Sequence, residues 1–254
     1  MAIRGILFDY FGTLCIYGDM AAAWADWLAA FHRNLSAHGL EMSLDDFSSR
    51  CNGFFEREEP ADNGKRLSIF ELRVLRLMLE LGLNEDLDAV RETATAAVNA
   101  WQKHVPFDDE APAVLGKLRN TKRLGLVSNF DHPPHLYGLL EKARLSELFE
   151  AVVISGEVGI KKPDPRIFSV ALHKMGLKSP EILYVGDTEE DVEGARRAGI
   201  EPVLIKRQRP AGSAVILDYS ADPARATDFT PAPDISRKVK TVARLSELLE
   251  PNRL

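Results

Sequence analysis

Residues 182–199 read ILYVGDTEEDVEGARRAG. The first five form a short apolar run, which is typical of a buried strand in a parallel sheet. The last eight, VEGARRAG, predict a helix that ends at Gly199. The turn between the strand and the helix is acidic and carries Asp187 and Asp191. The stretch therefore predicts one strand–turn–helix unit of a parallel α/β sheet.

The same alternation continues on both sides of this unit. Helical patterns occupy residues 111–120, 135–145 and 164–176. Short apolar runs occupy residues 123–128, 151–155 and 202–205. Near the N-terminus, a further run at residues 3–8 ends at Asp9. Strands that alternate with helices of this length predict an α/β fold with a Rossmann-like parallel-sheet core.

A long segment with a different hydrophobic pattern separates the first apolar run from the other predicted strands. From Met20 to His104 the sequence has helical periodicity and almost no strand signal; the patterns lie at residues 21–35, 68–82 and 87–104. Ser68 followed by Glu71 predicts an N-cap with a capping box. We therefore expect an inserted all-α cap domain at residues 19–105 and an α/β core domain at residues 1–18 and 106–254.

The last fifty residues depart from the alternation. Residues 206–238 are rich in proline and contain one short apolar run, at 214–217. They predict a mostly irregular surface excursion with room for one short edge strand. The closing residues 242–250, VARLSELLE, predict a helix whose apolar face packs on the sheet.

The amino-acid composition argues against several classes of function. The chain has 254 residues, 45% hydrophobic and 28% charged, with 32 basic and 38 acidic side chains and a formal charge of −6. This acidic balance argues against nucleic-acid binding. No apolar run is long enough for a membrane span, and the N-terminus does not resemble a signal peptide. Two cysteines, Cys15 and Cys51, exclude a disulfide scaffold and a four-cysteine zinc site. We expect a cytoplasmic protein, either a monomer or a homodimer.

Reactive side chains stand where the predicted parallel strands end, which is where open α/β sheets bind ligands. In chain order they are Asp9, Ser128, Asn129, Lys162, Asp187 and Asp191. Phosphoryl transfer uses such a set, because a carboxylate can attack phosphorus and carboxylates can hold a divalent cation. A hydroxyl and an ammonium group stabilise the charge of the transferring group. These residue types predict a small-molecule substrate that carries a phosphate.

The order of these motifs resembles the haloacid dehalogenase (HAD) superfamily of hydrolases. The resemblance rests on FDYFGTL, on Ser128 after a strand, on KKPDPRIF and on YVGDTEEDVEGARRAG, and it covers roughly residues 3–19 and 106–206. The helical insert resembles the superfamily's C1-type cap. The resemblance implies Mg²⁺-dependent hydrolysis of a small phosphorylated metabolite through an aspartyl-phosphate.

The resemblance also implies a role for each motif residue. Asp9 would be the catalytic nucleophile. Ser128, Asn129 and Lys162 would bind the phosphate, with Ser128 and Lys162 also counted as catalytic. Mg²⁺ would be held by Asp9, by the backbone carbonyl of Phe11 and by Asp187, and Asp191 would support this metal shell. From the residues alone, Asp191 could equally be a helix N-cap.

Phe11 departs from the phosphatase pattern. Phosphatases of this superfamily usually carry a second Asp two residues after the nucleophile, which protonates the leaving group. An aromatic residue there is a feature of the superfamily's 2-haloacid dehalogenases, so a dehalogenase is an alternative, with Arg33 as its candidate halide-binding residue. The chemistry of these dehalogenases uses no metal and does not need the acidic GDTEED turn, which counts against this alternative. Phosphonatases need a cap lysine, and neither Lys65 nor Lys103 has a matching context.

Two further possibilities stay open at this level. Phe11 could mark a degenerate phosphate-binding protein that turns over poorly. Alternatively, Glu58 or Glu59 of the insert could supply the missing proton. His132 and His135 have metal-like spacing, but the prolines between them favour an ordinary turn.

Overall fold

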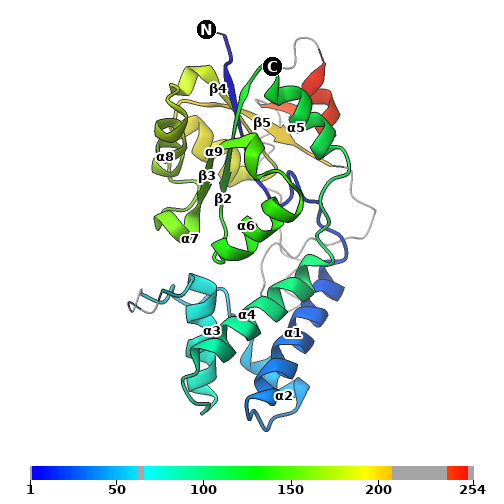
Figure 1. The fold of residues 1–254 in the computed structure, drawn as a ribbon, viewed down its shortest axis with the longest axis vertical. Helices are drawn as coiled ribbons and strands as arrows, with labels where there is room; N and C mark the ends of the chain where they lie inside the picture. Colours follow the sequence, from blue (N-terminus) through cyan, green and yellow to red (C-terminus); the bar gives the residue numbers. More distant parts are fainter. Residues whose placement is uncertain (1, 62–63, 65, 208–238, 251–254) are drawn as a thin grey trace. The chain divides into compact units, whose positions relative to one another are not determined.

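The computed structural model describes residues 2–61, 64, 66–207 and 239–250. These residues form two compact units (Figure 1). One unit contains the described residues of 1–16, 107–210 and 231–254, and the other contains those of 17–106. The chain thus passes between the units at residues 16/17 and 106/107, against the expected domain boundaries 18/19 and 105/106. The expected excursion at 206–238 lies, apart from residues 206 and 207, outside the described residues.

A six-stranded parallel sheet forms the centre of the first unit. Its strands are β1 (Gly5–Phe8), β2 (Arg123–Ser128), β3 (Phe149–Ile154), β4 (Ile182–Gly186), β5 (Glu201–Ile205) and β6 (Lys240–Val242). Their order across the sheet is β3-β2-β1-β4-β5-β6, and every neighbouring pair is parallel. This confirms the predicted α/β fold. In the register, Phe8 lies opposite Leu126 of β2 and Val185 of β4, so β1 ends slightly before both of its neighbours.

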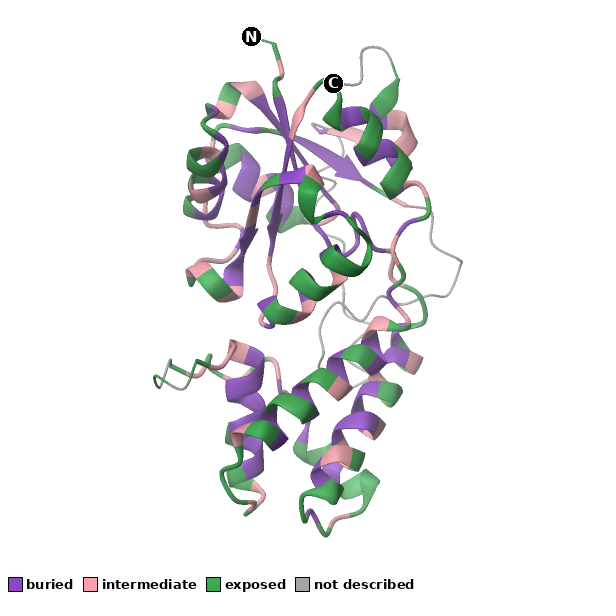
Figure 2. Cartoon of the chain, in the orientation of Figure 1, coloured by how far each residue is buried: buried purple, intermediate pink, exposed green. Residues whose placement is uncertain are grey.

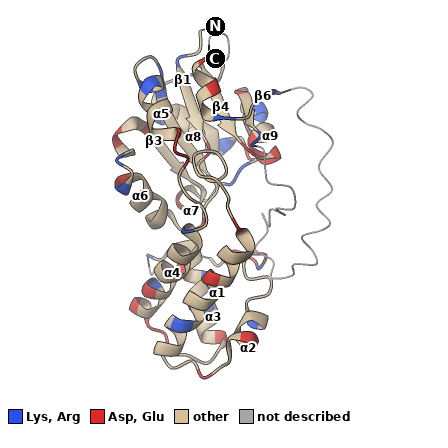
Figure 3. Cartoon of the chain, turned by 90° about the vertical axis from the view of Figure 1, so that its right-hand side faces the viewer, with Lys and Arg blue, Asp and Glu red and all other residues tan. Residues whose placement is uncertain are grey.

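Helices follow most strands of the first unit. They are α5 (Ala111–Arg119), α6 (Pro133–Lys142), α7 (Ser155–Val158), α8 (Arg166–Met175) and α9 (Glu189–Arg197), with 3-10 helices η1 (Ser146–Leu148), η2 (Ser179–Glu181) and η5 (Leu245–Leu249). Phe168 and Met175 of α8 pack with Leu7 and Val153 of the sheet in one buried cluster. Figure 2 shows the resulting burial of the strands. Acidic and basic residues are interspersed along the helices (Figure 3).

The prediction for the closing residues was wrong. Instead of one helix over 242–250, the chain forms β6 and then the short 3-10 helix η5. Val242 of β6 pairs with Ile205 of β5, and Leu245 and Leu248 are buried. The apolar side chains do pack inward, but pairing with β5 extends the backbone at the point where the helix was expected to begin.

The helical unit lies between β1 and β2 in the chain, as predicted. It contains α1 (Met20–Ala37), α2 (Leu44–Arg50), α3 (Ile69–Glu80) and α4 (Leu87–Gln102). Ser68 caps α3 through the predicted capping box with Glu71. Trp27 stacks on Trp24 and meets Phe31 edge to face, so this aromatic stripe packs within the unit. No helix among the described residues is both long and apolar enough to span a membrane.

Candidate active site

The ends of adjacent strands bring the predicted site residues together in the first unit. Asp9 directly follows β1, Ser128 is the last residue of β2, and Asp187 directly follows β4. Because β1 lies between β2 and β4, these three residues reach the same edge of the sheet. Lys162 comes to this edge from the segment between α7 and α8.

Lys162 is buried and uses all three of its ammonium protons. Its Nζ donates to Asp9 Oδ1 at 2.6 Å, to Asp191 Oδ1 at 2.7 Å and to the Tyr184 hydroxyl at 3.0 Å. Burial alone would lower the pKa of Lys162, but the two carboxylates outweigh it and hold the pKa above its ordinary value. The ammonium group therefore stays charged and fixed between two acids.

Asp191 belongs to the capping box of α9 and also bonds to Lys162. Its Oδ2 accepts hydrogen bonds from the backbone N–H groups of Asp187 and Thr188 and from the Thr188 hydroxyl. Thr188, rather than Asp191, is the N-cap of α9, and Asp191 is the third helical residue of the capping box. Gly186 makes room for this arrangement, since a Cβ there would lie 2.4 Å from Asp191 Cγ. Both carboxylate oxygens of Asp191 are thus engaged by the protein.

Asp187 lies against the loop that follows β1. Gly12 has a φ of +87°, and a Cβ at this position would lie 2.1 Å from Asp187 Oδ2. Only glycine therefore allows the backbone to approach this carboxylate so closely. The Thr13 hydroxyl donates to Asp187 Oδ1 at 3.4 Å, a long contact.

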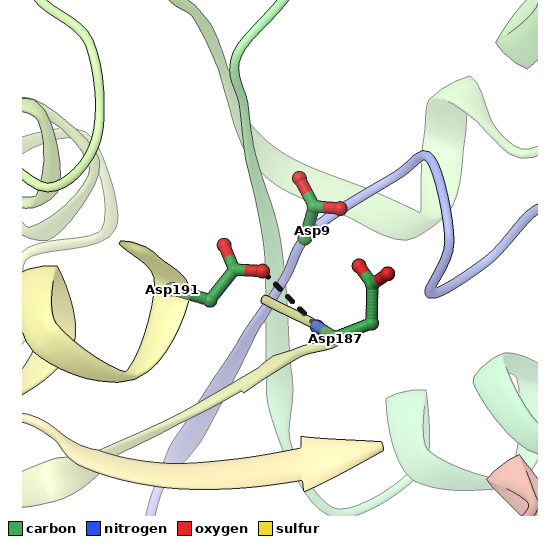
Figure 4. Close-up of side chains that lie close together, drawn as sticks. All are labelled: Asp9, Asp187 and Asp191. Atoms are coloured by element: carbon green, nitrogen blue, oxygen red, sulfur yellow. Dashed lines mark hydrogen bonds between the residues drawn. The ribbon is translucent and has the colours of Figure 1, made fainter. Parts of the chain in front are cut away.

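The three aspartates have the donor set and spacing of a divalent-cation site. One carboxylate oxygen from each of Asp9, Asp187 and Asp191 lies within 4.8 Å of the others (Figure 4). Mg²⁺ prefers such oxygen ligands. Burial raises the pKa of Asp9 to about 7, and Asp191 acts in the same direction against the opposing effect of Lys162. The Lys162 ammonium group bonds to Asp9 and Asp191, and a divalent cation would add positive charge beside all three carboxylates. The residues present fit Mg²⁺.

Ser128 is a buried polar group without a hydrogen-bond partner. The residue is 1% exposed, and its Oγ has no partner among the described residues. Such a group costs free energy unless a ligand or a water molecule satisfies it. An unsatisfied hydroxyl one strand away from Asp9 is therefore suited to bind a substrate oxygen.

Asn129 differs from the other predicted substrate-binding residues. Its side-chain amide donates to Lys162 O at 3.0 Å and accepts from Lys162 N at 2.8 Å. The amide group thus contacts the backbone of the lysine at both of its polar groups. This arrangement supports a positioning role for the side chain.

The Phe11 side chain packs against two other aromatic rings. Its ring meets Tyr10 edge to face, with centroids 4.9 Å apart, and lies 4.7 Å from the ring of Phe130. The loops that carry Asp9 and Ser128 therefore touch through phenylalanines. His135 lies next to Phe130, and burial lowers its pKa to about 4, so it is neutral near pH 7. Within the described residues, the histidines take no part in the candidate metal cluster.

Two groups beside the site, Tyr184 and Arg207, are not among the residues predicted from the sequence. Tyr184 was assigned only to a buried strand, but its hydroxyl bonds to Lys162 and lies within hydrogen-bond distance of Asp191 and Val127 O. A signal existed, because a tyrosine buried in a strand needs a partner for its hydroxyl. Arg207, which contacts the loop after β1, lies in a segment whose sequence carries no comparable signal.

Comparison with known proteins agrees with this geometry. The family of haloacid dehalogenase-like hydrolases matches residues 3–199. A phosphoserine phosphatase of Thermus thermophilus is 39% identical over 140 residues, which cover 54% of this chain and 55% of that protein. The chain therefore spans about half the length of this relative. A phosphatase of Mycobacterium tuberculosis is 26% identical and is matched over 87% of this chain and 95% of its own length.

Other relatives have a different named activity. An (S)-2-haloacid dehalogenase of a Pseudomonas species is 26% identical, covering 81% of this chain and 83% of its own. A 2-haloacid dehalogenase structure from Pseudomonas syringae has a TM-score of 0.60 at 21% identity and covers 97% and 96% of the two chains. A magnesium-bound HAD hydrolase of Bacillus subtilis has a TM-score of 0.57 at 18% identity and covers 98% and 97%. These structures show the shared fold.

The chain belongs to the haloacid dehalogenase-like hydrolases. The family match covers strands β1 to β4, the helical insertion and the acidic cluster in one continuous span. Its relatives include proteins named as phosphatases and as a dehalogenase.

Proposed function

We propose that this hydrolase is a Mg²⁺-dependent phosphatase for a small phosphorylated metabolite, acting through an aspartyl-phosphate on Asp9. The observation that carries the proposal is the cluster of Asp9, Asp187 and Asp191, in which one carboxylate oxygen from each lies within 4.8 Å of the others. A metal-independent hydrolase would not need three carboxylates at one place. The phosphatase relatives and the magnesium-bound neighbour support the same choice.

The chain's own residues account for binding and attack. An Asp9 carboxylate oxygen forms a bond to phosphorus while the bond from phosphorus to the leaving oxygen breaks, and that oxygen departs with the electron pair. Ser128 donates its unsatisfied hydroxyl to a phosphate oxygen. Lys162 orients Asp9 and stabilises the developing charge. Asp9, Asp187 and the Phe11 carbonyl would hold Mg²⁺, which when bound neutralises phosphate oxygens.

The second half of the reaction restores Asp9. Water attacks phosphorus while the bond between phosphorus and the Asp9 oxygen breaks, and its electron pair returns to the Asp9 carboxylate. The proton lost by the attacking water passes to solvent, which also protonates the departed leaving oxygen, and inorganic phosphate leaves. Phe11 cannot donate or accept a proton, so the core loop gives no help at this position. A general acid or base would therefore come from another part of the chain, and Glu58 and Glu59 of the helical unit are the candidates.

The helical unit serves in this proposal as a cap domain, residues 19–105, for a core domain of residues 1–18 and 106–254. A cap that closes on substrate excludes water and selects the leaving group. Its position between the nucleophile strand and the Ser128 strand in the chain supports this assignment.

A 2-haloacid dehalogenase is the second candidate function. Phe11 and the dehalogenase relative favour it. The Asp9 carboxylate would then displace halide from carbon instead of attacking phosphorus. Asp187 is the residue that distinguishes the two, because this reaction needs no metal ligand.

One experiment separates these functions. The full chain is incubated with a panel of phosphorylated metabolites, an aryl phosphate and 2-haloacids, each with and without Mg²⁺, while phosphate and halide release are measured. We expect phosphate release only with Mg²⁺, and a loss of several orders of magnitude in Asp9→Asn. Metal-independent halide release would establish the dehalogenase. Binding of Mg²⁺ and phosphate without turnover would establish a phosphate-binding protein.

A further inference from the structure

Arg207 lies two residues beyond β5, at the same end of the sheet as the aspartates. Its Nη2 donates to the carbonyl oxygen of Thr13 at 2.7 Å. The same nitrogen lies 2.6 Å from Asp108 Oδ2, and the arginine side chain is only 17% exposed. One guanidinium group therefore contacts both the loop after β1 and the segment that precedes α5.

The Asp108 segment is itself fixed to this loop. Asp108 N donates to Leu14 O at 2.9 Å, and Phe107 forms an antiparallel bridge with Cys15. Asp108 Oδ1 accepts from Glu110 N at 2.8 Å. The chain leaves the sheet unit just after this loop and returns to it just before this segment. Arg207 thus connects the end of β5 to two segments: the loop before the chain leaves the sheet unit and the segment where it returns.

The Arg207 pair does not have the geometry of a mainly stabilising ion pair. Arg207 Nε is buried without a partner among the described residues, and Asp108 Oδ2 lies outside the direction of a hydrogen bond despite its short distance. Removing two charges from water is costly, and imperfect hydrogen bonding recovers only part of that cost. A positional role explains this pair better than a contribution to stability.

The loop that Arg207 holds determines where Asp187 can lie. Gly12, next to the bonded Thr13, is in such close approach to Asp187 that no Cβ would fit between them. The Thr13 hydroxyl itself contacts Asp187 Oδ1. A displacement of the Thr13 backbone therefore moves either the carboxylate or the space available to it.

We propose that Arg207 is a positioning residue of the metal site, which it controls by fixing the Gly12–Thr13 backbone against Asp187. The proposal rests on the proposed function, since it assumes that Asp187 holds Mg²⁺. It assigns to the site a residue that touches neither substrate nor metal and lies outside the four sequence motifs.

The test is the Mg²⁺ affinity of the full chain, measured by titration calorimetry in Arg207→Gln and in the wild type. Outer residues that orient metal ligands typically change affinity by about 10- to 100-fold, and we expect a loss of about tenfold. Arg4→Gln is the matched control, because Arg4 also pairs with an acid but is 60% exposed at the other end of β1. It should bind Mg²⁺ like the wild type.

A second variant keeps the test decisive if Arg207→Gln does not fold. Arg207→Lys keeps the charge but lacks the planar guanidinium group and its length, so it should place a nitrogen between Thr13 O and Asp108 less well, and its affinity should fall between those of the wild type and Arg207→Gln. Unchanged affinity in Arg207→Gln, or in Arg207→Lys where Arg207→Gln does not fold, overturns the positioning role alone. A wild type that binds no Mg²⁺ overturns the proposed function and this inference with it.

Discussion

The side-chain amide of Asn129 forms hydrogen bonds to both backbone polar groups of Lys162, at 2.8 and 3.0 Å. This pair joins the loop after β2 to the segment before α8. Because Lys162 reaches Asp9 and Asp191 from that segment, Asn129 sets the point from which the ammonium group extends. The relationship gives a testable role to a residue that contacts the site through another residue's backbone.

Asn129→Ala should lower kcat by about 10- to 100-fold with a smaller effect on KM, since the nucleophile loses alignment more than the substrate loses contacts. Asn129→Asp keeps the acceptor for Lys162 N but loses the donor to Lys162 O. Its kcat should therefore lie between that of the wild type and that of Asn129→Ala. Steady-state kinetics with an aryl phosphate measures both. Asn120→Ala, at the exposed end of α5, is the control; a larger change in KM than in kcat would instead assign Asn129 to substrate binding.

Ser128→Ala should increase stability while it decreases activity. The substitution removes a buried hydroxyl that has no described partner, so the free energy of unfolding should rise by about 1 kcal/mol. Binding of inorganic phosphate should weaken because the donor is gone. Urea denaturation without metal and inhibition by phosphate measure the two effects. Ser169→Ala, on the exposed face of α8, controls for helix effects; a destabilised Ser128→Ala would show that the hydroxyl is satisfied in solution.

Asp187→Ala should weaken Mg²⁺ binding and abolish phosphate release, because Asp187 is the least enclosed carboxylate of the cluster and the one nearest the glycine loop. With beryllofluoride and Mg²⁺, the wild type should form an adduct on Asp9 that Asp187→Ala does not form. Fluorine NMR detects this adduct. Glu189→Ala, an exposed acid of the same turn, is the control. An adduct of equal stability in Asp187→Ala would remove Asp187 from the metal site.

Phe11→Asp should raise the hydrolysis of alkyl phosphates more than that of aryl phosphates. General acid catalysis is worth about 10² to 10⁴ in rate, and poor leaving groups need it most. The wild type should correspondingly prefer aryl or acyl phosphates. Single-turnover and steady-state rates with both substrate types measure the effect.

Phe11→Leu is the control for lost ring contacts with Tyr10 and Phe130, and it should not change the preference between substrates. If the wild type already hydrolyses alkyl phosphates at ordinary phosphatase rates and Phe11→Asp adds nothing, the proton comes from another residue. Glu58→Gln and Glu59→Gln would then show whether the helical unit supplies it.

Local signals explain what the sequence could predict. Five strands and the helical insert were predictable, because each has its own periodicity and the turns have recognisable caps. Strand β6 was not, since three residues of which only Val242 is buried carry no pattern and extend only because β5 lies beside them. The same holds for the site. Asp9, Lys162 and Asp187 stand in motifs, whereas the bond from Arg207 to Thr13 joins residues that only the folded chain brings together.

The central place of β1 has a consequence for synthesis on the ribosome. Gly5 pairs with Arg123 on one side and with Ile182 on the other, so the first strand to be made has no partner until the strand at residue 123 has been made. At about 5–20 residues per second, its first partner emerges on the order of ten seconds later. The four helices of the insert are complete by Gln102 and need no strand, so they can fold in that interval. We expect the interrupting unit to reach its structure on the nascent chain before the sheet that it interrupts.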